Sequence, residues 1–318
     1  MPAGAVDPSD AVWRRSVARR RFLSKAFALA VFGTAAVSIA GPHTPLVQTV
    51  RPQIIGIAHV ALQTSDLAQA RRFYGDLLGY AEIAPAGRAH VAAFAVNDRQ
   101  RLILHDGLPA DRDERLLAVA FETTSADAMR AFLEKRGQRV GDVMADVDAG
   151  GRQVEVTDPD GHHVRFVERG RHAPAEKGAA LDTRISRRIL HAGLTIRDVA
   201  AADTFYKDGL GFSEIWRGGR TPDVTSWINM RVPDATEYLE YMLVTSERVD
   251  RRQLGTLHHV ALVVPDMQEA LTIVRSRAAP DDPNHRATPQ IGRNNRWQLN
   301  LYDPDGTRIE FMEPWTVR

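Results

Sequence analysis

The chain has 318 residues, of which 44% are hydrophobic and 25% are charged, a composition typical of globular proteins. Its 41 basic and 40 acidic side chains almost cancel, so the charge balance gives no reason to expect nucleic acid or an anionic membrane as a partner. The absence of cysteine excludes a disulfide framework, a thiolate nucleophile and cysteine metal ligands, so any bound metal must be held by His and carboxylate side chains.

The first forty residues have the layout of an export signal. Arg19, Arg20 and Arg21 stand before an apolar run over residues 26–40, whose last three residues form a small-residue cleavage site. The arginines resemble a twin-arginine signature. The run is shorter than the ~20 residues that span a bilayer. We therefore expect export to the periplasm or the exterior with no membrane span after cleavage, whereas an uncleaved signal would leave a membrane anchor.

From Ile54 onward the chain repeats one pattern four times. Three segments begin with His and end with Asp, reading HVALQTSD from His59, HAGLTIRD from His191 and HVALVVPD from His259. A fourth segment, AVAFETTS, has Ala118 in the His position. Each begins with the alternation of a half-buried strand and ends in Asp or Ser, which are good helix N-caps. Such regular repetition indicates a duplicated supersecondary unit.

Each of these strands is followed by an amphipathic segment and then by short β-rich runs. The amphipathic segments read LAQARRFYGDLLGY, ADAMRAFLEKRG, VAAADTFYKDGLGF and MQEALTIVRSR. The second and fourth units also share an Asp-Pro-Asp-Gly turn before their last strand. The pattern predicts an α+β fold of four βαβββ modules, which start near Ile54, Leu116, Arg188 and Thr256.

A polar, charged segment separates the modules into two pairs, and it reads as a linker over residues 170–187. We therefore expect five parts in the chain. They are an export signal over 1–40, a linker over 41–53, a first domain over 54–169, the second linker over 170–187 and a second domain over 188–315.

The His positions, an F-Y-x-D-x-L-G pattern and a D-P-D-G-x-x-x-E ending resemble the vicinal oxygen chelate superfamily. That superfamily includes glyoxalase I, extradiol dioxygenases and bleomycin-resistance proteins. The resemblance extends from Ile54 to Pro314. It implies that each pair of modules curls into an incomplete barrel of mixed sheet around a metal, with ligands on the first strand and a late strand of each module.

For the second domain, the resemblance implies one divalent metal ion. Its ligands would be His191 and Glu240 from the third module and His259 and Glu310 from the fourth. A single His at the start of a half-buried strand is more often a core residue, but the same offset in two modules, each with a late Glu, favours a metal site. Burying an unpaired Glu is costly, and a metal ion removes most of that cost. Fe, Zn, Ni, Co and Mn all suit these ligands, so the identity of the metal stays open.

The first domain departs from this pattern. His59 is kept, but Ile103, Ala118 and Arg165 stand where the resemblance puts the other ligands. His105 remains a candidate ligand, although the fixed positive charge of a nearby arginine disfavours a cation. We expect this domain to be a structural partner or a degenerate binding pocket.

Several further residues are candidates for a substrate pocket or for plain surface positions. They are Gln298, Asn300 and Tyr302 on one predicted strand, Trp227 and Asn229 on another, and Arg293 or Arg296 in a loop, where one of the two would meet an anionic substrate group. His162 and His163 follow the first Asp-Pro-Asp-Gly turn and are expected to face solvent.

The favoured function is a glyoxalase-like lyase or isomerase whose small substrate chelates the metal through two adjacent oxygens. As a Lewis acid, the metal would stabilise an enediolate. The resemblance favours Glu310, with Glu240 as the second carboxylate, as the catalytic group that moves a proton between neighbouring carbons.

Two other functions stay open. An extradiol-type dioxygenase would hold Fe(II) on His191, His259 and Glu310 and cleave a catechol-like substrate. Against it, Asn300 stands where that family has Tyr, and Glu240 would crowd the metal. The third function is a non-catalytic protein that sequesters a small molecule. The sequence also leaves open whether the pairs close within one chain or exchange modules in a homodimer.

Overall fold

The computed structural model describes residues 50–83, 89–110, 114–147, 150–170, 182–244, 254 and 256–317. The predicted export signal and most of the two predicted linkers lie outside these residues. Within the described part of the chain, no helix is both long enough and apolar enough to cross a membrane.

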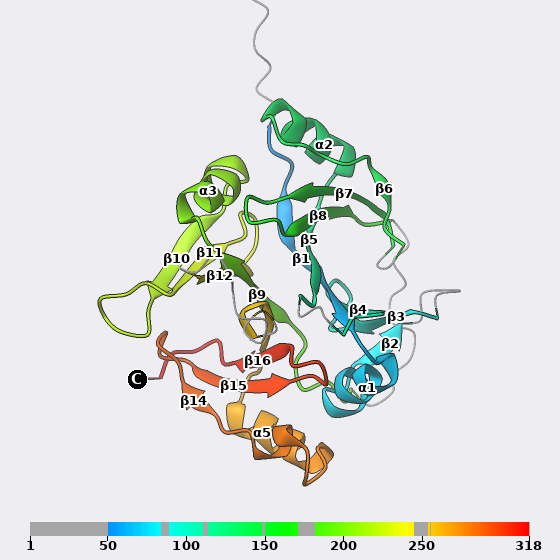
Figure 1. The fold of residues 1–318 in the computed structure, drawn as a ribbon, viewed down its shortest axis with the longest axis vertical. Coiled ribbons are helices and arrows are strands. Elements are labelled where there is room, and N and C mark those ends of the chain that lie inside the picture. The colour runs from blue at the N-terminus through cyan, green and yellow to red at the C-terminus, as the bar shows by residue number, and fades with distance from the viewer. Residues whose placement is uncertain are drawn as a thin grey trace, which may run out of the picture. The chain divides into compact units, whose positions relative to one another are not determined.

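Two eight-stranded mixed sheets, each curled into an incomplete barrel, carry the fold (Figure 1). The first contains β1 (Ile54–Thr64), β2 (Ala81–Ile83), β3 (Val91–Ala95), β4 (Arg101–Asp106), β5 (Leu116–Thr123), β6 (Met144–Ala145), β7 (Arg152–Thr157) and β8 (His163–Glu168). The second contains β9 (Ile189–Ile196), β10 (Ser213–Gly218), β11 (Trp227–Arg231), β12 (Tyr238–Leu243), β13 (His259–Val263), β14 (Gln290–Ile291), β15 (Trp297–Tyr302) and β16 (Arg308–Met312).

The two sheets have the same topology. Their strand orders are β2-β3-β4-β1-β5-β8-β7-β6 and β10-β11-β12-β9-β13-β16-β15-β14, which correspond strand by strand. Within each sheet, the first strands of the two modules pair antiparallel at the centre, as β1 with β5 and β9 with β13. This correspondence is what a duplicated pair of modules produces.

One helical segment follows the first strand of each module. These segments are α1 (Leu67–Arg71) continuing into the π-helical η1 (Arg72–Leu77), α2 (Ala126–Lys135), α3 (Val199–Asp203) continuing into the π-helical η2 (Thr204–Gly209), and α5 (Met267–Arg277), after which comes the 3₁₀ turn η3 (Pro283–Arg286). The predicted N-caps are confirmed, because Asp66, Ser125, Asp198 and Asp266 each accept a hydrogen bond from a backbone N–H of the first turn. The predicted α+β fold of four βαβββ modules is confirmed.

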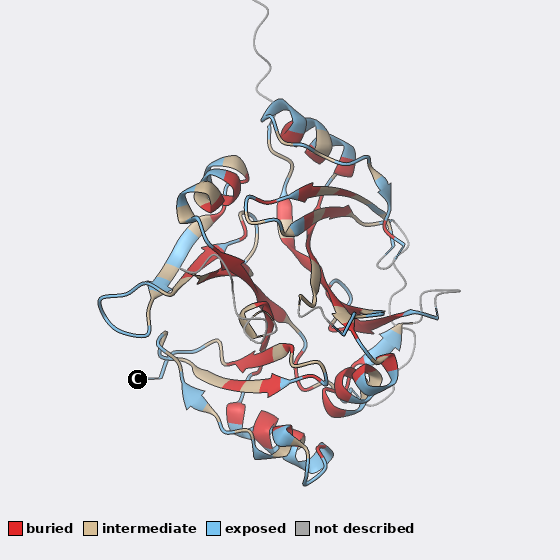
Figure 2. Cartoon of the chain, in the orientation of Figure 1, coloured by how far each residue is buried: buried red, intermediate tan, exposed pale blue. Residues whose placement is uncertain are grey.

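Buried residues gather along the strands and on one side of each helix (Figure 2). All eight residues of β9 are buried. Ala192, Leu194 and Ile196 belong to the main hydrophobic core, whereas His191 and Gly193 alternate with them on the other face of the strand. The core therefore fixes the strand whose opposite face carries the first candidate ligand.

The F-Y pattern and the Asp-Pro-Asp-Gly turn meet across the two halves. Tyr74 of the first module donates to Asp303 Oδ2 of the fourth at 3.0 Å, and Tyr206 of the third donates to Asp158 Oδ2 of the second at 2.8 Å. All four side chains are buried. These repeated landmarks therefore hold the halves together.

The prediction that His162 faces solvent is wrong. Its Nδ1 lies 2.9 Å from Asp158 Oδ2, and its Nε2 lies 3.2 Å from His258 Nε2, in the contact between the halves. His163 is exposed as predicted, and its Nδ1 lies 2.7 Å from Glu155 Oε1. The turn orients His162 inward because the Asp158 carboxylate also accepts from the His162 backbone N–H.

Candidate metal centre

Four neighbouring strands at the centre of the second sheet each contribute one candidate ligand. In the order β12-β9-β13-β16, these residues are Glu240, His191, His259 and Glu310. Gly193 pairs with both Glu240 and His259, and Ala261 pairs with both His191 and Glu310. The register therefore brings all four side chains to one face and to neighbouring levels of the sheet.

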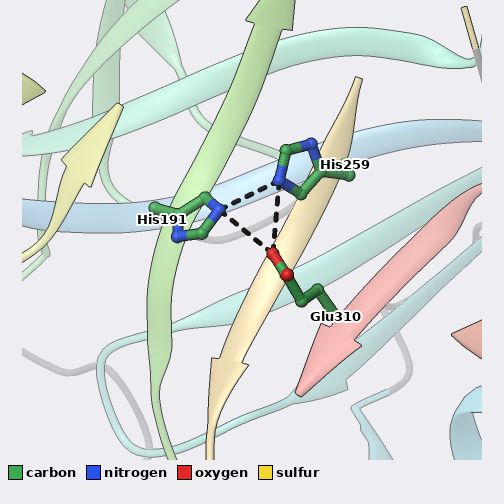
Figure 3. A group of neighbouring side chains, drawn as sticks. All are labelled: His191, His259 and Glu310. Atoms are coloured by element: carbon green, nitrogen blue, oxygen red, sulfur yellow. Dashed lines mark hydrogen bonds and ion pairs between the residues drawn. The ribbon is translucent and has the colours of Figure 1, made fainter. Parts of the chain in front are cut away.

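The donor atoms of these residues converge, and Figure 3 shows three of the four. His191 Nε2 lies 2.9 Å from His259 Nε2, and Glu310 Oε2 lies 3.6 Å from each of them. Glu240 Oε2 lies 3.3 Å from His259 Nε2 and 3.7 Å from His191 Nε2. Bonds of about 2.1 Å to one ion would separate neighbouring donors by about 3.0 Å at a right angle and about 3.4 Å at a tetrahedral angle. The distances among His191, His259 and Glu310, and those from Glu240 to the two imidazoles, are close to these values, whereas Glu240 is not part of the group of described residues whose donor atoms all lie within 4.8 Å of one another.

Burial keeps both imidazoles neutral, which is the form that binds a metal. It lowers the pKa of His191 to about 3, against the opposing effect of the Glu240 charge, and it lowers the pKa of His259 well below its ordinary value. His259 Nδ1 donates to Leu257 O at 2.8 Å, so His259 Nε2 presents a lone pair to His191 and the carboxylates. Because a cation would stabilise so many converging acceptors, these residues fit a divalent metal ion.

Glu310 is the more deeply buried carboxylate of the site, with 5% of its side chain exposed against 12% for Glu240. Burial raises the pKa of Glu310 to about 7, the charge of Arg308 opposes this rise, and the charge of Glu240 adds to it. A carboxyl group that titrates near neutral pH is suited to hold and release a proton.

Gly193 makes room for His259, a role that the sequence analysis missed. A Cβ added at Gly193 would lie 2.1 Å from His259 Nδ1 and 2.2 Å from its Cε1. The imidazole therefore occupies the space that the side chain of any other residue would need. The available signal was a glycine inside a strand, which often marks a close approach. The register puts Ala61 at the corresponding position of the first sheet.

Two of the candidate ligands, Glu240 and Glu310, line a pocket of about 270 Å³, just below the range of roughly 300–1,000 Å³ for small-molecule sites. Its lining includes Glu240, Glu310, Trp216, Trp227, Gln298, Asn300, Arg293 and Arg308. The pocket therefore combines two aromatic walls with polar and charged groups beside the candidate ligands.

The predicted pocket residues divide into two groups. Trp227, Gln298 and Asn300 line the pocket, whereas Tyr302 is 42% exposed and lies outside that lining. Asn229 is buried beside Glu240 on the neighbouring strand.

The arginines of the pocket differ from the predicted pair. Arg293 lines the pocket and donates to Arg220 O at 2.5 Å, while Arg296 is not part of the lining. Arg308 lines the pocket and was missed by the sequence analysis. Its position two residues before Glu310 on one strand face was the signal that could have found it.

The corresponding face of the first sheet is filled with small apolar side chains. A separate hydrophobic cluster there consists of Ala61, Val91, Ala93, Ile103 and Ala118. By register, Ile103 takes the place of Glu240, Ala118 that of His259 and Arg165 that of Glu310. Arg165 Nε donates to Glu155 Oε2 at 2.8 Å. An ion pair and an apolar cluster therefore stand where the second sheet has its converging donors.

His105 does not share a site with His59. The register pairs His105 with Gln63, four residues beyond His59, which corresponds to about 13 Å along the strand. Ala61 and Ile103 of the apolar cluster lie between the two histidines on the paired strands. The register therefore argues against His105 as a second ligand beside His59.

Comparisons with known proteins agree with this architecture. A model of the family described as the Glyoxalase/Bleomycin resistance protein/Dioxygenase superfamily matches residues 56–166 and 188–311. The Uncharacterized protein YwbC of Bacillus subtilis (strain 168) is 27% identical over 129 residues, which make up 41% of this chain and 99% of that protein.

Two solved structures have a similar fold. The Mn(II)-bound glyoxalase from Novosphingobium aromaticivorans is 19% identical, with 82% of this chain and 83% of that chain covered at a TM-score of 0.62. A mutant of homoprotocatechuate 2,3-dioxygenase from Brevibacterium fuscum is 21% identical, with 83% and 72% covered at a TM-score of 0.63. At these identities the likeness concerns the fold alone.

Proposed function

The chain belongs to the glyoxalase, bleomycin-resistance protein and dioxygenase superfamily, and we propose that its second half is a divalent-metal-dependent lyase or isomerase. Its substrate would be a small molecule with two adjacent oxygens. The observation that carries this proposal is the presence of Glu240 within 3.7 Å of both imidazoles, as a fourth donor beside His191, His259 and Glu310.

The four donors would hold one metal ion, which when bound supplies a Lewis acid for two neighbouring substrate oxygens. Glu310 would take a proton at a carboxylate oxygen from one substrate carbon and return it to the adjacent carbon. His191 and His259 stay neutral, because burial lowers the pKa of each, and so they would not compete for that proton.

A second candidate function is an extradiol-type dioxygenase. The specific observation in its favour is that, among the described residues, His191, His259 and Glu310 form a group without Glu240 whose donor atoms all lie within 4.8 Å of one another, as a two-histidine, one-carboxylate set requires. One residue counts against the dioxygenase. Asn300, which pairs with Glu310 in the register, stands where a Tyr would be expected for this chemistry.

Metal content per chain, measured by mass spectrometry on protein purified without oxygen and without added metal, separates these functions. About one manganese, nickel, zinc or cobalt ion per chain would support the lyase or isomerase. About one iron ion that is lost or oxidised in air would favour the dioxygenase. No metal, and no uptake on soaking, would contradict both and leave a small-molecule binding protein.

Two variants sharpen the choice. Glu240→Gln should strongly weaken metal binding if four donors hold the ion, and should leave binding nearly unchanged if the three-residue set suffices. Glu310→Gln should abolish turnover by either enzyme. It should leave small-molecule sequestration by the first half intact, if that is the function.

We also propose that the protein is exported, on the pattern of residues 1–40 alone. Changing Arg19 and Arg20 to Lys should then retain the chain in the cytoplasmic fraction, where a fractionation blot would detect it.

A further inference from the structure

We infer that the substrate carries an anionic group, such as a carboxylate, that binds Arg308 beside the metal centre. This inference rests on the proposed function and names the substrate class for the same pocket. It concerns a residue that no candidate ligand set includes.

The position of Arg308 points its charge toward the site. It lies two residues before Glu310 on β16, so both side chains leave the same face, with about 6.6 Å of strand between them. It pairs in the register with His259 on β13. Arg308 and Glu310 both line the pocket. An anion held by Arg308 would therefore lie in the same pocket as the carboxylates of Glu240 and Glu310.

One donor of the Arg308 guanidinium is left unpaired among the described residues. Arg308 Nε is buried and has no hydrogen-bond partner there. Leaving a buried charged donor without a partner is costly. A ligand that brings an acceptor into the pocket would remove that cost.

In the first sheet, the residue at the position of Arg308 has a charged partner within the protein. There the register puts His163 in the place of Arg308 and Glu155 in the place of Asn300. Glu155 contacts both His163 and Arg165, at 2.7 and 2.8 Å. In the second sheet, the neutral Asn300 replaces this carboxylate. The positive charge of Arg308 is therefore left for a ligand to pair with.

The charge balance of the pocket supports the same substrate class. A divalent ion would be balanced by Glu240 and Glu310, so the two arginines of the lining, Arg293 and Arg308, would remain as excess positive charge. Arg293 already donates to a backbone carbonyl, Arg220 O, at 2.5 Å. Arg308, whose Nε is buried without a hydrogen-bond partner among the described residues, is therefore the better placed arginine for an anionic substituent.

The test uses two ligands that chelate alike and differ only in the charged group, 3,4-dihydroxybenzoate and 4-methylcatechol. Binding of each to the Mn(II)-loaded full chain is measured by calorimetry at pH 7.5. The unchanged protein should bind the carboxylate about tenfold or more tightly than its neutral partner, as expected for a charge-assisted hydrogen bond in a partly buried site.

Arg308→Gln should reduce the ratio of the two affinities to about one, chiefly by weakening the binding of 3,4-dihydroxybenzoate. Arg308→Lys should restore part of the preference. Mn(II) affinity should stay the same or rise in both variants, because neither adds positive charge near the ion. Arg293→Gln is the matched control and should keep most of the preference.

An unchanged preference in Arg308→Gln, or its loss in Arg293→Gln instead, would overturn the inference while leaving the metal site in place. Failure of the unchanged chain to bind Mn(II) or any other divalent ion would refute the proposed function itself, and the role of Arg308 with it.

Discussion

Substituting Gly193 by Ala is the most direct test of how the sheet builds the candidate metal centre. Gly193 donates nothing to a metal and does not line the pocket. It lies between Glu240 and His259 in the register, and its missing side chain leaves the space that the His259 ring fills. The substitution therefore changes ligand position without removing a ligand.

The structure sets the size of the effect. The new Cβ would lie 2.1 Å from His259 Nδ1, whereas ordinary contact begins near 3.4 Å, so the ring must retreat by about 1.3 Å. That shift would also disturb the hydrogen bond from His259 Nδ1 to Leu257 O, which fixes the tautomer. We expect divalent-metal affinity to fall by about a hundredfold, the upper range when the support of a ligand is lost. Overpacking should lower the free energy of unfolding by about 1–3 kcal/mol.

The assay is a Mn(II) titration followed by the electron paramagnetic resonance signal of the free ion, with urea unfolding in parallel. Gly75→Ala is the matched control, because a Cβ added there meets nothing closer than 3.8 Å. The control should bind Mn(II) like the unchanged chain. Mn(II) affinity of Gly193→Ala within threefold of the unchanged chain would refute the reasoning.

A double substitution identifies the clash. In a His259→Ala background the imidazole is absent, so adding Gly193→Ala should cost clearly less unfolding free energy than it does alone. Some cost should remain, because Leu257 O also lies 2.8 Å from the added Cβ. Equal costs in both backgrounds would show that the ring is not what Gly193 accommodates.

Three more variants address protonation, the first sheet and the contact between the halves. Because the pKa of Glu310 is about 7 in the metal-free site, Mn(II) affinity should fall about tenfold for each pH unit below 7 and level off above it, and Glu310→Gln should remove most of that slope in the titration. In the metal-free protein, the contribution of Glu310 to the free energy of unfolding should be present below pH 4.5 and be lost as the pH rises through about 7, because its folded-state pKa is raised. Urea unfolding across pH should show this trend in the unchanged chain and not in Glu310→Gln. His59→Ala should leave Mn(II) affinity within twofold, since an apolar cluster fills the first sheet, and a larger loss in the same titration would contradict that. Tyr74→Phe should lower the free energy of urea unfolding by about 1.5–3 kcal/mol by removing the hydrogen bond to Asp303, and an unchanged value would mean that this bond does not hold the halves.

The module pattern could be predicted because its signals are local. Asp66 and Asp198 follow their strands at a fixed offset and cap the next helix, so each boundary depends on a few neighbouring residues. The hydrogen bond from Tyr74 to Asp303 could not be foreseen, because it joins residues 229 positions apart. The same holds for His162, whose partner His258 is 96 positions away. Only the packing of the two halves creates these contacts.

The candidate ligands were found because the repeat supplied an internal comparison. His191 and His259 occupy the same offset in two modules, and Ala118 marks its loss in a third. Gly193 and Arg308 offered no such repetition, since their roles depend on which residues the register places opposite them. Prediction therefore reached the four candidate ligands, and missed the residues that shape the space and charge around them.

The first half still acts on the candidate site, although its own face is filled. Thr64 and Ser65 at the end of β1 donate to the Asp305 carboxylate, and Tyr74 donates to Asp303. Both aspartates belong to the turn that leads into β16, where Asp303 also accepts from the Thr307 backbone N–H at 2.7 Å. The strand that carries Glu310 and Arg308 is therefore anchored at its start by the first module. The first half, whose described residues include no such group of converging donors, can therefore be retained because it fixes the strand that carries Glu310 and Arg308 in the other half.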